Sequence, residues 1–204
     1  MQFSGIYAIT DDLLLPGQRL FAAVEDALRA GIRLLQYRSK CESADYKFDC
    51  AKQLVALCNE YQTPLIINDD IDLCEMVGAA GVHLGRMDGD IRSARNSLGT
   101  NAIIGITCHS SIDEALKAEQ IGASYVAFGR FFPSITKPGA PVAELHLIAQ
   151  AREVLSIPIV AIGGINAENG AAVLQAGADM LAVIHAVFGG DDVTGQTLKL
   201  VKLC

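Results

Sequence analysis

Eight short apolar runs, each followed by a longer amphipathic or polar segment, constrain the fold of this chain more than any other feature. In segments such as 20–30, 45–61, 112–121 and 168–176, apolar residues recur at steps of three and four, which is typical of a helix packed on one side. The apolar runs have the length of buried strands and cover residues 6–9, 34–37, 65–68, 81–84, 103–106, 125–128, 159–162 and 180–183.

The number of these units predicts the architecture. The chain has 204 residues, so each strand–helix unit takes about 25 residues, with little room for insertions. No break in composition divides the chain, and we therefore expect one α/β domain over residues 1–204, a closed (β/α)₈ TIM barrel. A doubly wound open sheet is the alternative, but no G-x-G-x-x-G follows the first run.

Glycines repeat at the predicted junctions between helices and strands. Gly31, Gly81, Gly122 and Gly177 each stand just before or at the start of an apolar run. Glycine commonly ends helices because it adopts the left-handed conformation without steric cost. We expect each of the four to close a helix.

Charge and hydropathy limit the partners of this chain. Its net charge is -7, which argues against nucleic acids and anionic membranes as partners. No apolar run approaches the ~18 residues of a membrane span, and the first residues lack the basic segment of a signal peptide. We expect a cytoplasmic protein that acts on small molecules, and the sequence leaves open whether it is a homo-oligomer.

The six cysteines include no C-x-x-C pair and no zinc-finger spacing. In a cytoplasmic chain this pattern predicts reduced, buried thiols. A catalytic thiol at Cys108, next to His109, is the alternative.

The end of the second run carries a cluster of polar side chains. Gln36, Arg38 and Lys40 alternate and should share one face of the strand. The repulsion between the two cations would be relieved by an anion with several oxygens, such as a diphosphate. The alternative is a strand end with solvated charges.

Acidic residues follow the next two runs. Asp69 and Asp88 are one strand–helix step apart, so both should stand at the rim of the barrel where the strands end. Two neighbouring carboxylates favour a hard cation, and Mg²⁺ held by carboxylates and substrate phosphates is the usual arrangement. The alternative is helix capping, which we expect of Asp70.

The remaining strand ends supply hydroxyls, a loop and glycines. After the fifth run Thr107 is a candidate ligand, whereas Ser110 or Ser111 should cap the next helix. Residues 128–139 suit a lid over a ligand. The pair Gly163-Gly164, together with the backbone after the eighth run, matches the place where such barrels bind phosphate. The rim thus offers two anion sites, while His83 should be a hydrogen-bonded interior residue.

Together these motifs resemble the thiamine phosphate synthase family. The resemblance runs in order along nearly the whole chain. It rests on Gln36-x-Arg38-x-Lys40, Ile67-Asn68-Asp69, His83-Leu84-Gly85-x-x-Asp88, Phe132-Pro133-Ser134-x-Thr136-Lys137 and Ala161-Ile162-Gly163-Gly164-Ile165.

The resemblance implies a transferase that joins hydroxymethylpyrimidine diphosphate to a thiazole phosphate and releases diphosphate, with Mg²⁺ as cofactor. It implies Asp69 and Asp88 as metal ligands, and Arg38, Lys40 and Lys137 as catalytic cations. The other substrate-binding residues that we expect are Gln36, Tyr37, Ser39, Asn68 and Thr107 together with Ser134, Ile135, Thr136, Gly164, Ile184 and His185.

Three positions depart from the family pattern. Thr107 stands where serine is usual, Arg86 replaces a common glutamine, and His185 replaces a phosphate-binding serine. Two alternatives remain on the same barrel. One is an isomerase that resembles the thiazole tautomerases, and the other is a protein that binds thiamine phosphate without catalysis.

Overall fold

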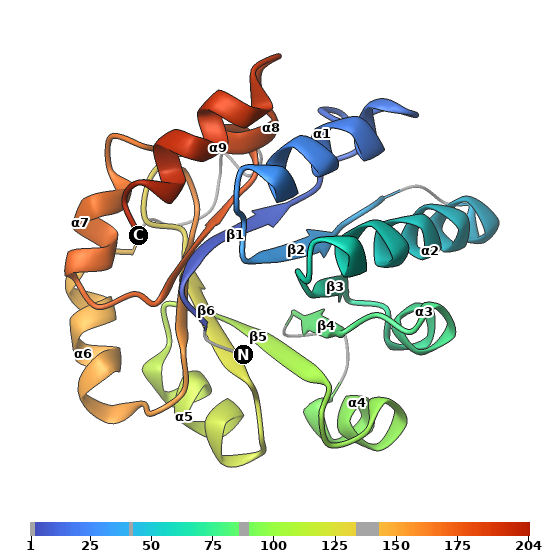
Figure 1. The fold of residues 1–204 in the computed structure, drawn as a ribbon. Coiled ribbons are helices and arrows are strands. Elements are labelled where there is room, and N and C mark those ends of the chain that lie inside the picture. The colour runs from blue at the N-terminus through green and yellow to red at the C-terminus, as the bar shows by residue number, and fades with distance from the viewer. Residues whose placement is uncertain (1–2, 41–42, 86–89, 134–142) are drawn as a thin grey trace.

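The apolar runs pair side by side in chain order and close on themselves. All eight strands are parallel, and β1 pairs with both β2 and β8, so the sheet is a closed barrel. The helices lie outside it (Figure 1). The structure is a computed structural model and describes residues 3–40, 43–85, 90–133 and 143–204. The predicted TIM barrel is confirmed.

The elements alternate along the chain as the pattern predicts. The strands are β1 (Gly5–Ile9), β2 (Leu34–Tyr37), β3 (Leu65–Asn68), β4 (Gly81–Leu84), β5 (Ile103–His109), β6 (Tyr125–Gly129), β7 (Ile159–Ile162) and β8 (Met180–Val183). The helices are α1 (Arg19–Arg29), α2 (Ala44–Glu60), α3 (Ile71–Val77), α4 (Ile91–Leu98), α5 (Ile112–Gln120), α6 (His146–Val154), α7 (Gly170–Gln175), α8 (His185–Phe188) and α9 (Val193–Val201).

Alternation along the strands divides the apolar side chains into two layers. An inner layer fills the barrel and includes Tyr7, Leu34, Ile66, Tyr125 and Val160. The intervening residues of the same strands face the helices and form a larger outer layer. Strands with apolar side chains on both faces are what a parallel barrel requires.

β5 is longer than its apolar run. It continues to His109, and its pairing with β6 shifts register between Thr107 and His109. The apolar run ends at residue 106, so the sequence predicts Thr107 and His109 after the strand. In the structure both residues belong to the strand. The shift redirects the side chains at the strand end, which is a common effect of such irregularities.

The helix signals are confirmed with one exception. Asp70 and Ser111 cap α3 and α5, accepting hydrogen bonds from the backbone N–H of Leu73 and Glu114. The prediction that Gly81 closes a helix is wrong, because α3 already ends at Gly78 and Gly81 begins β4. A Cβ at Gly81 would lie 1.9 Å from the carbonyl oxygen of Ile103, so close strand packing explains this glycine.

Polar side chains tie the loops together at the amino-terminal ends of the strands. Arg95 donates to the carbonyls of Gly99, Thr100 and Ala102, and also to Gly122. In the loop before β7, the backbone N–H groups of Ser156 and Ile157 and the Ser156 hydroxyl donate to the Glu119 carboxylate. These contacts fix the entry into β5, β6 and β7.

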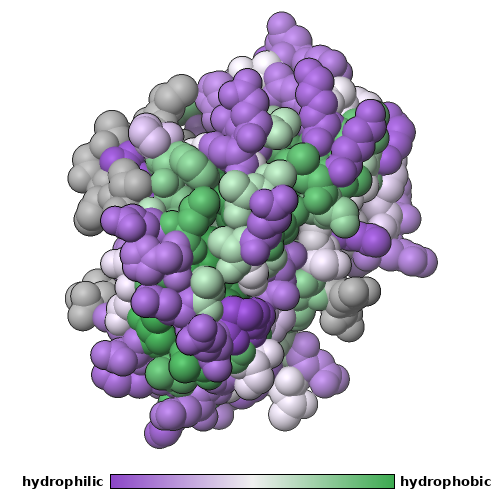
Figure 2. Space-filling model, turned by 90° about the vertical axis from the view of Figure 1, so that its left-hand side faces the viewer, coloured by the Kyte–Doolittle hydropathy of each residue, from purple (hydrophilic) through white to green (hydrophobic). Residues whose placement is uncertain are grey.

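The outer surface is mixed in character. On the face that carries α6 and α7, hydrophilic side chains predominate and apolar side chains emerge between them (Figure 2). Within the described part of the chain, no helix combines the length and the apolar character needed to cross a membrane.

Substitution of Glu119 by glutamine should lower stability in a pH-dependent way. The hydrogen bonds from Ser156 lower the pKa of the Glu119 carboxyl below its ordinary value of 4.5. The stabilisation is therefore complete above that value and is lost as the pH falls through the folded-state pKa. Urea unfolding at pH 7 should show E119Q less stable by about 1 kcal/mol, since solvent weakens this contact.

The difference between E119Q and the unsubstituted protein should shrink when the same unfolding is measured below pH 4.5. Glu153→Gln, at an exposed position of α6, is the matched control and should change little. An equal loss at both pH values would contradict the proposed role of the Glu119 charge.

Candidate active site

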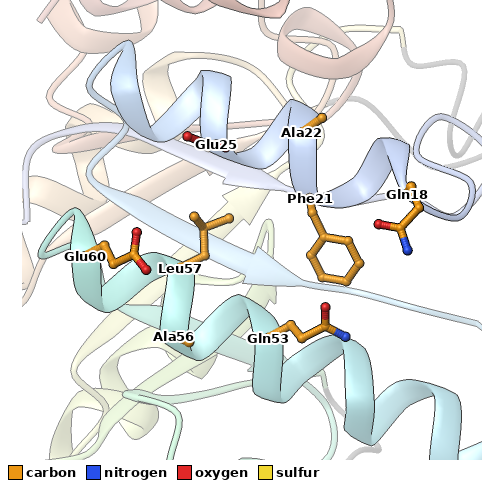
Figure 3. A pocket seen from close by; sticks show the side chains of 8 residues that line it. All are labelled: Gln18, Phe21, Ala22, Glu25, Gln53, Ala56, Leu57 and Glu60. Carbon is orange, nitrogen blue, oxygen red and sulfur yellow. The ribbon is translucent and has the colours of Figure 1, made fainter.

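The described residues form two hollows that could bind a ligand. One is a groove between α1 and α2, where Phe21 and Leu57 face each other (Figure 3). Its charged lining residues are the carboxylates Glu25 and Glu60. No Lys or Arg is among its lining residues, whereas an anionic ligand is best held by such cations.

The other hollow is a pocket of about 660 Å³ at the carboxyl ends of the strands. Residues at the ends of all eight strands line it, and they include both charged and apolar side chains. In barrels of this class the active site lies at this face. We therefore take this pocket as the candidate active site.

Arg38 is the cation on the β2 side of the pocket. The end of β1 holds its backbone: Thr10 Oγ1 accepts from Arg38 N at 2.9 Å and donates to Arg38 O at 3.2 Å. The guanidinium lies 3.8 Å from the Asp11 carboxylate, and both side chains are mostly shielded from solvent. Arg38 is thus pre-positioned and already faces one anionic group.

Asp12 holds the next two residues of the same loop. Its Oδ2 accepts from Lys40 N at 2.6 Å and from Ser39 Oγ at 3.1 Å. The sequence drew attention to the cations of this loop and not to the carboxylates that shape it. The position of Asp11-Asp12 just after the first run was the available signal, because residues at this rim converge.

Asp69 stands at the end of β3 with its backbone in the left-handed region, at a φ of 64°. Asn68 Nδ2 donates to its carboxylate at 2.6 Å, and Asp69 N donates to the carbonyl of His83 at 2.8 Å. Both residues line the pocket. A left-handed aspartate anchored on two sides is typical of a functional position.

The opposite side of the pocket includes two glycines, which contribute backbone atoms only. Gly163 and Gly164 have φ values of 104° and 66°, and they line the pocket together with Ile184 and His185. A Cβ at Gly164 would lie 2.4 Å from the Pro133 carbonyl oxygen. Glycine is therefore needed both for the conformation and for the close approach of two chain segments.

The structure places the predicted site residues in three groups. Gln36, Arg38, Asn68, Asp69, Thr107, Gly164, Ile184 and His185 line one pocket. Tyr37 packs in the outer layer between β2 and the helices, because it alternates with Gln36, and Ser39 and Lys40 lie on the loop held by Asp12. Asp88, Ser134, Ile135, Thr136 and Lys137 lie outside the described residues, as does Arg86.

None of the cysteines that the structure describes lines the pocket. Cys108 is fully buried, and burial raises the pKa of its thiol to about 12, which suppresses the reactive thiolate. The described cysteines are free thiols, as predicted, although Cys204 is exposed and not buried. His83 is a hydrogen-bonded interior residue, also as predicted.

Several residues that line the pocket were not singled out from the sequence. They include Tyr7, Ile9 and Val160 from the apolar runs, and Asn166 from the segment after β7. Tyr7 and Ile9 lie within an apolar run, where nothing in the local pattern separates a pocket residue from a core residue. Their exposure to the pocket follows from barrel closure.

Asp12 gives a test of the loop that carries Ser39 and Lys40. Asp12→Ala should weaken the binding of inorganic diphosphate about tenfold in calorimetry, since the loop loses both hydrogen bonds. Asp12→Asn keeps an acceptor oxygen and should retain most of the affinity. If the carboxylate merely repelled the ligand, both variants would bind more tightly. Asp191→Ala, at an exposed ion pair with Arg19, is the control.

Comparison with known proteins identifies the family. The family model described as thiamine monophosphate synthase matches residues 6–187. The thiamine-phosphate synthase of Saccharophagus degradans is 53% identical over 199 residues, 97% of this chain and 92% of its own. That of Thioalkalivibrio sulfidiphilus is 49% identical over 98% of this chain and 94% of its own.

A solved structure agrees with this assignment. The thiamine phosphate pyrophosphorylase of Pyrococcus furiosus superposes with a TM-score of 0.89 at 36% identity, covering 99% of this chain and 96% of that one. The fold, the pocket at the strand ends and the near full-length similarity agree, and the chain is an enzyme of the thiamine monophosphate synthase family.

Proposed function

We propose that this enzyme condenses 4-amino-2-methyl-5-hydroxymethylpyrimidine diphosphate with 4-methyl-5-(2-phosphoethyl)thiazole to give thiamine phosphate and diphosphate. The observation that carries the proposal is the presence of two different anion-binding arrangements in one pocket. Arg38 and Asp69 lie on one side, and the backbone around Gly164 and His185 lies on the other. A diphosphate donor and a phosphate-bearing acceptor would fill both.

The β2 side would hold the diphosphate. The Arg38 guanidinium can donate two parallel hydrogen bonds to phosphate oxygens and would exchange its contact with Asp11 for them. Lys40, on the loop held by Asp12, and Lys137, outside the described residues, would add positive charge. Neutralising the leaving diphosphate lowers the barrier to breaking its bond to carbon.

Mg²⁺ is proposed as the cofactor, with Asp69 and Asp88 as its protein ligands. Asp69 is exposed to the pocket and fits this role, because Mg²⁺ takes only one or two carboxylates and completes its shell with water and substrate phosphates. When bound, the metal would supply charge neutralisation at the diphosphate.

The proposed reaction is a dissociative substitution, which needs no general base. Both ring nitrogens of His83 are already hydrogen-bonded, to Tyr125 and Thr107. The pyrimidine would ionise to a carbocation, which the thiazole nitrogen captures. Apolar side chains such as Ile9, Val160 and Ile162 line the same pocket and would keep water from that cation.

One assay tests the proposed reaction. The protein is mixed with both substrates, with and without Mg²⁺, and thiamine phosphate and diphosphate are measured. We expect both products in equal amounts, only with the metal. Metal-independent isomerisation of the thiazole would point instead to a tautomerase, and tight binding without turnover would point to a binding protein.

Asp69→Asn should lower kcat about a hundredfold at saturating Mg²⁺, since one charge that holds the metal at the leaving diphosphate is lost. The Kd for the thiazole phosphate should not change, because its proposed site lies on the other side of the pocket. Asp72→Asn, an exposed aspartate on α3, is the control and should behave as the unsubstituted enzyme. Normal turnover by D69N would rule out the metal assignment.

A further inference from the structure

A row of hydrogen bonds crosses the barrel at the pocket, and four of its five side chains, all except Tyr125, line the pocket. Gln36 Nε2 donates to Tyr7 Oη at 2.7 Å, and Tyr7 Oη lies 2.9 Å from Tyr125 Oη. Tyr125 Oη lies 2.9 Å from His83 Nδ1, and His83 Nε2 lies 2.8 Å from Thr107 Oγ1. The row thus joins a pocket residue on β2 to a pocket residue on β5.

One direction lets every hydroxyl hydrogen of this row find a partner within it or at its end. Gln36 donates its amide N–H to Tyr7 Oη, and in this arrangement Tyr7 donates its own hydrogen to Tyr125. Tyr125 then donates its own hydrogen to His83 Nδ1. A neutral His83 carries its proton on Nε2 and donates to Thr107 Oγ1.

This direction decides what the two ends offer to a ligand. Gln36 donates one of its two Nε2 hydrogens to Tyr7, and its carbonyl oxygen stays available to a ligand as an acceptor. Thr107 accepts from His83 and keeps its hydroxyl hydrogen to donate. The pocket therefore has an acceptor on the β2 side and a donor on the β5 side.

The barrel is shaped to hold the middle of the row. Tyr7 and Tyr125 are 1% and 0% exposed, and the Tyr125 ring stacks on His83 with an interplanar angle of 19°. Burial raises the pKa of both phenols, which keeps them neutral. A Cβ at Gly105 would lie 2.2 Å from Tyr125 Oη, so this glycine provides the space for the hydroxyl.

We propose that Tyr7, Tyr125 and His83 are positioning residues that fix the hydrogen-bonding polarity of Gln36 and Thr107. The arrangement selects a flat heteroaromatic ring that carries an amine donor on the edge facing β2 and a ring-nitrogen acceptor on the edge facing β5. The inference rests on the proposed function in one respect, that the aminopyrimidine ring lies between these two ends. It assigns the two tyrosines and the histidine no direct part in bond breaking.

Tyr125→Phe tests the proposal because it removes the hydroxyl that donates to His83. His83 Nδ1 can then take the proton, Nε2 accepts from Thr107, and the Thr107 hydrogen turns away from the ligand. We expect kcat/KM for the pyrimidine diphosphate to fall about tenfold, the effect of one hydrogen bond. The KM for the thiazole phosphate should be unchanged, a split that a general loss of structure would not produce.

A double-mutant cycle shows whether Tyr125 acts through Thr107. If it does, adding Tyr125→Phe to Thr107→Val should cost little beyond Thr107→Val alone. Additive losses, or equal losses for both substrates, would overturn the proposal. Tyr61→Phe removes a tyrosine hydroxyl that bonds to Glu25 near the outer helices, and it should leave both substrates unaffected.

A measurement on the unsubstituted protein avoids any dependence on the folding of a variant. The nitrogen chemical shifts of ¹⁵N-labelled histidine distinguish the two neutral tautomers, and His83→Gln assigns the signal among the four histidines. We expect the Nε2–H tautomer at His83, and the Nδ1–H tautomer would overturn the proposal. If thiamine phosphate formation failed while the Nε2–H tautomer was found, the proposed function would fail and the polarity of the row would stand.

Discussion

The pairing of β1 with β8 is the contact on which the rest of the molecule depends. Tyr7 lies opposite Ala182 in that pair, and its other neighbour is Leu34 on β2. Because every strand then has two parallel partners, all eight carboxyl ends meet at one rim. Closure brings the loop after β2 to the same pocket as the glycine pair after β7, although about 125 residues separate them along the chain.

The sequence predicted the barrel well because its signals are local. Apolar runs and helical periodicity are read within a few residues, and five of the eight strands have the limits that the runs indicated. β5 differs because its register shift lets polar residues continue the ladder. The prediction for Gly81 was wrong because the close approach of β5 requires glycine there, and not the end of the preceding helix.

The candidate site was only partly predictable, because local sequence signals do not show which distant residues meet in the fold. Strand ends can be located from the sequence, which therefore predicts that Arg38, Asn68, Asp69 and Thr107 lie at one rim, and all four line the pocket. Partners that come from another part of the barrel cannot be found in this way. Tyr7 and Tyr125 are 118 residues apart, and both lie in apolar runs where a tyrosine resembles an ordinary core residue.

The hydrogen bonds from Arg95 and to Glu119 lie at the amino-terminal ends of the strands, on the far side of the barrel from the pocket. Their bonds secure the loops that feed β5, β6 and β7, and none of these groups lines the pocket. Loop anchoring and the candidate active site therefore occupy opposite rims of one scaffold. A substitution at the first rim can change the free energy of unfolding without altering a residue that lines the pocket.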